Sequence, residues 1–336
     1  MILLRKSHII ILSVIILIAL CLADVLLVGS GLGVSEALNG IFRGGDMAGN
    51  IVWRIRIPRI ATAILAGSAL SMAGTQMQAI FRNPLADPHI MGVSSGAGLL
   101  AAIATIAIPT GALSAAGSAF QGITIAGAAF LGAILSSALI VAAMGKIRSG
   151  GTLLIFGVMA GFIFSAFTSI IEYSASEQSL KLFYSWAAGS FAGNTWGNLY
   201  LMAGLLLVGI ILYLLNAKGL DIVLFGDEYS ELSGADVKRI RQIALLGCCL
   251  VTGGITAFCG PIGFVGIISP HIARLLLKTS SHRKILPAAL CIGAIICVTA
   301  DILSQCFSIP VPPGSTVAII GIPFILYILM GHDSFS

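Results

Sequence analysis

Asp87 and His89 are the residues of this sequence whose types and spacing come closest to a chemical site. They lie two positions apart in RNPLADPHIMGVSSGAG, residues 82–98, and a further candidate, His271, ends the later segment GPIGFVGIISPH. A carboxylate beside an imidazole could work as acid and base or as metal ligands. However, the spacing matches no HExxH motif, and no cluster of Asp or Glu accompanies either histidine. We therefore expect no catalytic residue, metal ion or cofactor here.

The prolines of the first segment favour a structural role. Pro84 and Pro88 each fix their own φ and move the preceding residue toward an extended conformation, so the chain is expected to turn. Asn83 and Asp87 precede these prolines, and their side chains can accept hydrogen bonds from nearby backbone amides. RNPLADPH is therefore predicted to be a structural turn at the end of a helix.

The second segment, GPIGFVGIISPH, contains three glycines and two prolines. Such a run leaves backbone groups unpaired unless they face protein or a water-filled cavity. We predict a broken helix beside a transport pathway. The residues expected to form it are Gly260, Pro261, Gly263 and Pro270.

The composition indicates which elements must position these segments. Of the 336 residues, 58% are hydrophobic and 9% charged, and the mean hydropathy is +1.06. Soluble proteins are about 45–50% apolar and about 25% charged. The chain is therefore predicted to be an all-α, polytopic membrane protein with a single transmembrane domain, residues 1–336. The seven cysteines form no CxxC pair, which favours packing inside helices over disulfides or metal binding.

Apolar runs predict about ten transmembrane helices, each needing about 20 mostly apolar residues. The predicted spans are residues 9–28, 60–80, 90–108, 122–144, 152–171, 198–215, 241–258, 263–277, 285–304 and 315–330. With both termini in the cytoplasm, 13 of the 18 Lys and Arg fall on the inner side, as the positive-inside rule requires. The outer ones are Arg43, Arg54, Arg56, Arg59 and Lys181.

Two charged segments are candidate partner surfaces. WRIRIPR places arginines outside, where the positive-inside rule disfavours them, so either an acidic docking partner or lipid headgroups would have to meet them. The inner loop, residues 216–240, alternates apolar and acidic residues. This pattern predicts a short amphipathic helical pair that could lie in a partner's groove, with a plain solvated loop as the alternative.

Energy coupling is constrained by what the sequence lacks. No GxxxxGK[ST] motif occurs, so this chain cannot cradle ATP phosphates itself. Asp24 and Asp301 are the only acids well inside predicted spans. Ion-coupled transport usually needs an intramembrane relay, so a secondary transporter is the less favoured alternative.

Several long blocks resemble the FecCD family of ABC importer permeases, which includes iron-siderophore, haem and vitamin B12 permeases. They run in order from about residue 50 to the end: RIPRIATAILAGSALSMAGTQMQAIFRNPLADPHIMGVSSGAG, GPIGFVGIISPHIARLL, HRKILPAAL, ADIL and GIPFILYILM. The resemblance implies a type II ABC importer permease fold and a homodimer in the bacterial inner membrane, with the pathway at the dimer interface. It also implies two ATPase subunits inside, a bilobed solute-binding protein outside, and no nucleic-acid partner.

The resemblance also assigns residues to these contacts. The family's cytoplasmic coupling helices match residues 225–237, and its outer arginines, which meet acids of the binding protein, match Arg56 and Arg59. A further arginine of some members falls on Gln305 here, so that part of the docking contact stays open. An iron chelate, ferric siderophore or haem, is the leading cargo and cobalamin the alternative. The implied coupling residues are Phe225, Gly226, Asp227, Glu228, Glu231, Leu232 and Gly234.

Overall fold

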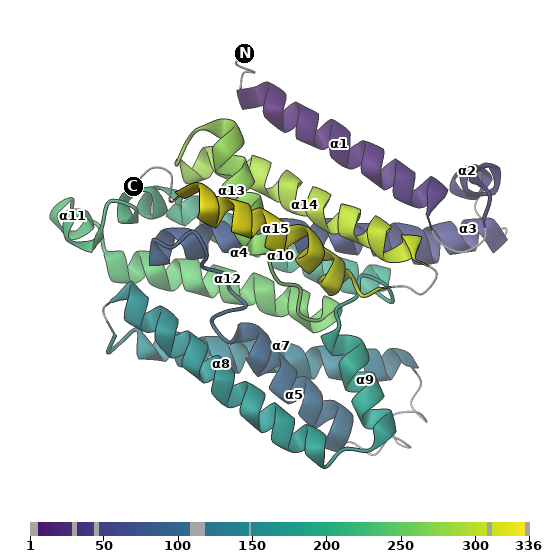
Figure 1. Cartoon of the computed structure of the whole chain (residues 1–336), viewed down its shortest axis with the longest axis horizontal. Helices are drawn as coiled ribbons and strands as arrows, with labels where there is room; N and C mark the ends of the chain where they lie inside the picture. Colours follow the sequence, from purple (N-terminus) through teal and green to yellow (C-terminus); the bar gives the residue numbers. More distant parts are fainter. Residues whose placement is uncertain are drawn as a thin grey trace. The chain divides into compact units, whose positions relative to one another are not determined.

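The computed structural model of the chain describes residues 6–28, 32–43, 47–107, 118–147, 149–307 and 311–332. Within these ranges the regular structure is helical, with no strand (Figure 1). Seven of the described helices are long and apolar enough to cross a membrane, and three shorter apolar helices accompany them. Together they match the ten predicted spans one to one, which confirms the all-α, polytopic architecture.

The bounds of these ten helices differ by a few residues from the predicted spans, except that α10 extends to Val223, well beyond the predicted end at residue 215. The longer ones are α1 (Lys6–Leu27), α4 (Ile57–Phe81), α7 (Ser118–Ala143), α8 (Gly150–Tyr173), α10 (Trp196–Val223), α12 (Val237–Cys259) and α14 (His282–Cys306). The shorter apolar ones are α5 (Val93–Ala107), α13 (Val265–Leu277) and α15 (Pro313–His332).

Short helices that the apolar runs did not predict lie between the spans. They are too short and too polar to stand out in a search for about 20 apolar residues. A π-helix, η1, leads directly into α4 and carries Arg54 and Arg56 of WRIRIPR, whereas Arg59 lies in the first turn of α4. The described short helices are α2 (Val34–Arg43), α3 (Met47–Ile51), η1 (Val52–Arg56), α9 (Glu177–Ala187) and α11 (Asp227–Leu232).

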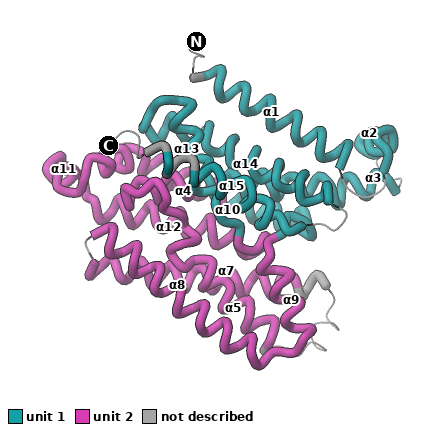
Figure 2. Tube along the Cα trace, viewed as in Figure 1, with its two compact units in different colours: residues 1–72, 190–204, 262–336 teal, residues 73–189, 205–261 magenta. Residues whose placement is uncertain are grey.

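The chain divides into two compact units (Figure 2). Unit 1 comprises residues 1–72, 190–204 and 262–336, and unit 2 comprises residues 73–189 and 205–261. Two long helices, α4 and α10, contribute residues to both units.

Unit 1 is organised around α14, against which α1, α13 and α15 pack. At the crossing of α4 with α14, a Cβ atom on either Gly67 or Gly293 would collide with the other's backbone. The hydroxyl of Ser71 donates across the same crossing to the carbonyl oxygen of Ala289, at 2.6 Å. Because apolar surface gains little by leaving lipid for another helix, such close backbone approach is a main source of attraction between these helices.

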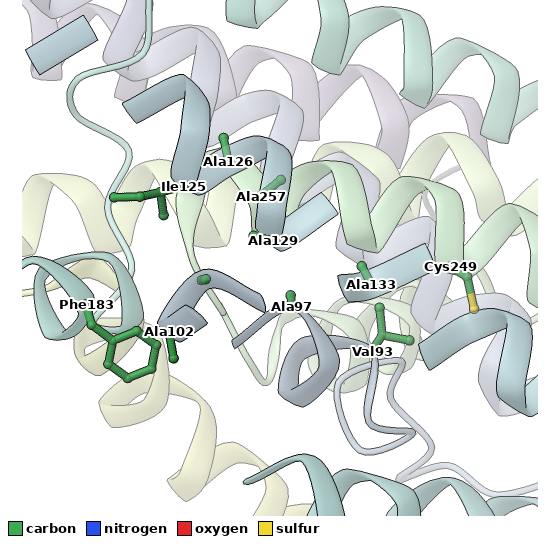
Figure 3. Close-up of a cluster of buried hydrophobic side chains, with 11 residues drawn as sticks. Val93, Ala97, Ala102, Ile125, Ala126, Ala129, Ala133, Phe183, Cys249 and Ala257 are labelled. Atoms are coloured by element: carbon green, nitrogen blue, oxygen red, sulfur yellow. The ribbon is translucent and has the colours of Figure 1, made fainter. Parts of the chain in front are cut away.

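Unit 2 is organised around α5, which packs against α7, α8, α9 and α12. The buried cluster between these helices consists largely of alanines (Figure 3). Here too the helices approach closely, since a Cβ on Gly96 would lie 2.7 Å from the carbonyl oxygen of Gly132. The cluster comprises Val93, Ala97, Ala101, Ala102, Ile125, Ala126, Ala129, Ala133, Phe183, Cys249 and Ala257.

The predicted loop of residues 216–240 is shorter than expected because α10 continues to Val223. Leu220 and Val223 are fully buried, so the last turns of α10 pack inside the protein. The amide nitrogen of Asn216 also donates to the carbonyl oxygen of Ile240 at 2.8 Å, which ties α10 to α12. One short helix, α11, therefore forms where a helical pair was predicted.

Candidate coupling, docking and pathway residues

The segment RNPLADPH forms a turn directly after α4. Arg82 adopts a left-handed conformation, with φ of 48°. The side-chain oxygen of Asn83 accepts a hydrogen bond from the amide of Leu85 at 2.9 Å. Asp87 accepts one in the same way from the amide of His89 at 2.8 Å. The two polar residues that precede the prolines thus satisfy backbone donors that the break in the helix leaves open.

Asp87 and His89 both contact neighbouring groups of the protein. Asp87 is 2% exposed, and burial raises the pKa of its carboxyl, while the nearby His89 opposes that rise. The Nδ1 atom of His89 lies within hydrogen-bonding distance of the hydroxyl of Ser94, at the start of α5. Among the described residues, no three His, Cys, Asp or Glu side chains gather into a possible metal site.

The segment GPIGFVGIISPH contains a break between two helices, as Gly260, Pro261 and Gly263 predict, whereas Pro270 lies inside the second helix. The helix α12 ends at Cys259, and α13 begins at Val265. Between them Gly260 has a φ of 71° and Phe264 a φ of 70°. Space also requires glycine at 260, because a Cβ there would lie 3.1 Å from the Cα atom of Gly189. The boundary between the two units falls within this break.

Arg59, one of the predicted docking residues, forms an ion pair with Asp301 of α14. Its Nη2 lies 2.7 Å from Oδ1, and its Nε lies 2.9 Å from both carboxylate oxygens. The side chain of Arg59 is 21% exposed, whereas that of Asp301 is fully buried. The amide nitrogen of Gln305 also donates, at 3.3 Å, to Asp301 Oδ2 and to Asp24 Oδ1. Both acids of the predicted spans therefore belong to one network with Arg59.

Arg56, the other predicted docking residue, is 7% exposed. Its Nη1 donates to the carbonyl oxygen of Val25 in α1. Arg54 and Trp53 of the same helix η1 are exposed. Of the three arginines of WRIRIPR, Arg56 and Arg59 therefore bind groups within unit 1, and Arg54 is exposed.

Sequence reasoning missed the partners of these arginines. A general signal was present, because an acid inside a span is expected to pair with another group. The sequence did not indicate which group, since Arg59 and Asp301 are separated by 242 positions.

The predicted coupling residues lie on and beside α11, on two sides of it. Two of them have large side chains that face outward, Phe225 at 74% exposed and Leu232 at 89%, and Tyr229, which was not predicted, joins them at 58%. The rings of Phe225 and Tyr229 pack against each other with centroids 5.5 Å apart. Glu228 and Glu231 are exposed as well.

The opposite side of α11 is attached to the protein. Ser230 is fully buried, and its hydroxyl donates to the carbonyl oxygens of Gly226 and Ile222. Gly226 and Gly234, which flank the helix, have φ values of 106° and 82°, a region that favours glycine. Asp227 forms ion pairs with Arg82 and Arg241.

A hollow of about 580 Å³ lies beside α11 within unit 2. Apolar side chains from the α7–α8 region form one part of its wall, and charged side chains from α11 and α12 form another. Its lining residues are Met144, Ile147, Ser149, Leu153, Asp227, Glu228, Glu231, Val237, Lys238 and Arg241.

The fold defines a multi-pass helical membrane protein. The chain matches a solved structure described as a metal-chelate type ABC transporter in an inward-facing conformation, with a TM-score of 0.82 and 23% identity over 97% of this chain and 99% of that one. The FecCD transport family matches residues 14–331, and the chain belongs to that family. It is a permease subunit rather than an enzyme, and ATP hydrolysis belongs to a separate ATPase subunit.

The relatives of this chain are named for different transported compounds. The hemin transport system permease HmuU of Yersinia pestis is 32% identical, with 83% of each chain covered. The cobalamin import system permease BtuC of Halobacterium salinarum is 34% identical, covering 84% of this chain and 74% of the relative. The Fe(3+)-citrate import system permease YfmE of Bacillus subtilis is 32% identical, covering 83% and 81%.

We predict that the RNPLADPH turn contributes backbone geometry and no chemistry. His89→Ala should keep most of the uptake rate per inserted permease, whereas Pro84→Ala combined with Pro88→Ala should lower it. Each proline that is replaced raises the conformational entropy of the unfolded chain, which lowers the free energy of unfolding by about 0.4–1 kcal/mol. The backbone of the turn is also less restricted. Uptake into proteoliposomes and metal analysis of the purified protein check this. A stoichiometric metal ion that disappears with His89→Ala would contradict it.

Proposed function

We propose that this chain is the permease of an importer that carries an iron chelate, a ferric siderophore or haem, across the inner membrane of a bacterium. Cobalamin is the alternative cargo. The permease acts as a homodimer with its termini in the cytoplasm, two ATPase subunits inside and a solute-binding protein outside, and both compact units of each chain serve as one permease domain. Relatives named for hemin and Fe(3+)-citrate support iron, and one named for cobalamin supports the alternative.

The observation that carries the proposal is the outward stripe on α11. Tyr229 and Leu232 lie three positions apart on α11, Phe225 precedes the helix and packs its ring against that of Tyr229, and all three side chains are mostly exposed. A helix with such anchors is suited to lie in a groove of a partner protein. Glu228 and Glu231 flank the stripe with negative charge, which adds electrostatic selectivity for a basic surface. The partner we propose for this stripe is the ATPase subunit.

The geometry of Arg59, which lies in the first turn of α4, supports docking of the binding protein. A guanidinium group carries five N–H donors and can meet two carboxylates on different edges. Asp301 engages the edge formed by Nε and Nη2, and Nη1 donates to none of the described residues. We propose that this remaining edge meets a carboxylate of the binding protein. Arg56 contributes to the same site through its position in η1.

ATP-dependent uptake tests the proposal directly. Permease with its cognate ATPase and binding protein in proteoliposomes should accumulate a ⁵⁵Fe-labelled siderophore or haem. Phe225→Ser, Tyr229→Ser and Leu232→Ser combined should weaken ATPase association by at least about tenfold, roughly 1.4 kcal/mol, and abolish uptake. Tyr173→Ser, which changes an exposed aromatic residue outside α11, is the matched control and should keep both.

Two results would redirect the proposal. Uptake of cobalamin alone would establish the alternative cargo. Uptake that continues without any ATPase and collapses with the proton gradient would instead identify an ion-coupled secondary transporter, with α11 an ordinary solvated surface helix.

A further inference from the structure

Asp227 differs from the other acids of α11 in what it contacts. Two ion pairs converge on this carboxylate. Arg241 places Nη2 2.9 Å from Oδ1 and 3.0 Å from Oδ2, and Arg82 places Nη2 3.5 Å from the same Oδ1. One carboxylate oxygen is thus shared by two guanidinium groups.

The two arginines belong to different long helices. Arg82 directly follows α4 and is the first residue of the RNPLADPH turn, where its φ is 48°. Arg241 lies near the start of α12, and its side chain is 7% exposed. Asp227 therefore connects the short helix α11 with the end of one long helix and the beginning of another, all within unit 2.

The surroundings leave space for both guanidinium groups. A Cβ on Gly226 would lie 3.2 Å from Nη1 of Arg82, and a Cβ on Gly150 would lie 3.2 Å from Nη2 of Arg241. Both distances are tighter than ordinary van der Waals contact, so glycine at these positions keeps room for the paired arginines. The arrangement is independent of the outward stripe, which lies on the other side of α11.

We propose that Asp227 is a positioning residue that links α11 mechanically to the RNPLADPH turn and to α12, and does not itself contact the ATPase. This inference rests on the proposed function, in which the outward stripe of α11 binds the ATPase subunit. When the ATPase displaces α11, the shared carboxylate pulls on both arginines, because it is the group that keeps two like charges together. Without it, Arg82 and Arg241 repel each other and α11 moves alone.

The test separates association from coupling. In the reconstituted complex, Asp227→Asn should leave ATPase association unchanged but lower the uptake per ATP hydrolysed by at least about tenfold. Glu177→Gln, which changes an exposed acid in the first turn of the short helix α9, is the matched control and should alter neither quantity. A merely structural role would lower association and uptake together.

Arg82→Gln provides a second variant. Its side chain is 45% exposed, so removing its charge should not impair folding. It should lower uptake per ATP with association unchanged, and Asp227→Asn combined with Arg82→Gln should be no worse than Asp227→Asn alone, since both remove the same link. Fully additive losses, or unchanged uptake per ATP in Arg82→Gln, would overturn the inference.

The outcomes also separate this inference from the function on which it rests. If Asp227→Asn weakens ATPase association as the stripe variant does, Asp227 is a contact residue and the inference is wrong, while the proposed function stands. If the stripe variant leaves association intact, the proposed ATPase surface is wrong.

Discussion

Gly293→Leu is expected to prevent accumulation of folded permease. At the crossing of α4 with α14, a Cβ on Gly293 would lie 2.6 Å from the Cβ of Ser71 and would collide with the carbonyl of Gly67. The obstacle is mostly backbone, which cannot rotate away as a flexible side chain can. Overpacking of a core usually destabilises by about 1–3 kcal/mol, and a clash with backbone on a neighbouring helix places this variant at the upper end or beyond.

Several hydrogen bonds would be lost with the same displacement. The hydroxyl of Ser68 donates to the carbonyl oxygen of Leu290 at 3.1 Å, and that of Ser71 donates to Ala289 at 2.6 Å. Because natural proteins are stable by only about 5–15 kcal/mol, the combined effect should be visible as aggregation or loss of the monodisperse species in detergent.

The matched control for this prediction is Gly204→Leu. Gly204 also lies within a long helix of unit 1, but a Cβ there would meet nothing within 4 Å. This variant should therefore fold normally. Equal thermal stability of the two variants, measured by unfolding in the same detergent, would show that the helices do not approach at Gly67 and Gly293 as described.

Asp301→Leu is expected to destabilise the permease by roughly 3–5 kcal/mol, the range observed when one partner of a buried ion pair is removed. The substitution leaves the guanidinium of Arg59 without its carboxylate, next to a buried apolar side chain. Arg59→Met combined with Asp301→Leu should recover most of the loss, because a packed apolar pair avoids burying an unpaired charge. Thermal unfolding of the wild type, both single variants and the double variant measures this directly.

The double variant also separates folding from docking. It should be inserted and stable, yet bind the solute-binding protein at least about tenfold more weakly, which corresponds to roughly 1.4 kcal/mol. Lys181→Met, which removes an exposed cation from α9, is the control and should bind normally. Unchanged affinity of the double variant at low and high salt would remove Arg59 from the docking site, and Arg59 would then serve only to pair with Asp301.

Local features of the chain account for what could be predicted. Ten spans follow from runs of about 20 apolar residues, and the structure has a helix for each. The turn after Phe81 and the break after Cys259 follow from Pro84, Pro88 and Gly260, because proline and glycine restrict or extend the backbone at their own positions. Family membership was also accessible, since its blocks are long and contiguous in the sequence.

The extent of α10 shows where local reasoning fails. Polar residues after Asn216 resemble a loop, yet Leu220 and Val223 are buried and keep the segment helical. Tertiary packing overrides local preference here, because burial of these side chains depends on neighbours that the segment itself does not contain.

The sequence by itself determined the class of this protein, its spans, its turn and its helix break, because each depends on residues adjacent in the chain. Only the tertiary structure decided which charges meet. Arg59 pairs with Asp301, and Asp227 pairs with Arg82 and Arg241, and each of these partners lies on a different helix or turn. Those pairings depend on how separate helices cross, and the crossings depend in turn on close approaches such as that of Gly67 and Gly293, more than 200 positions apart.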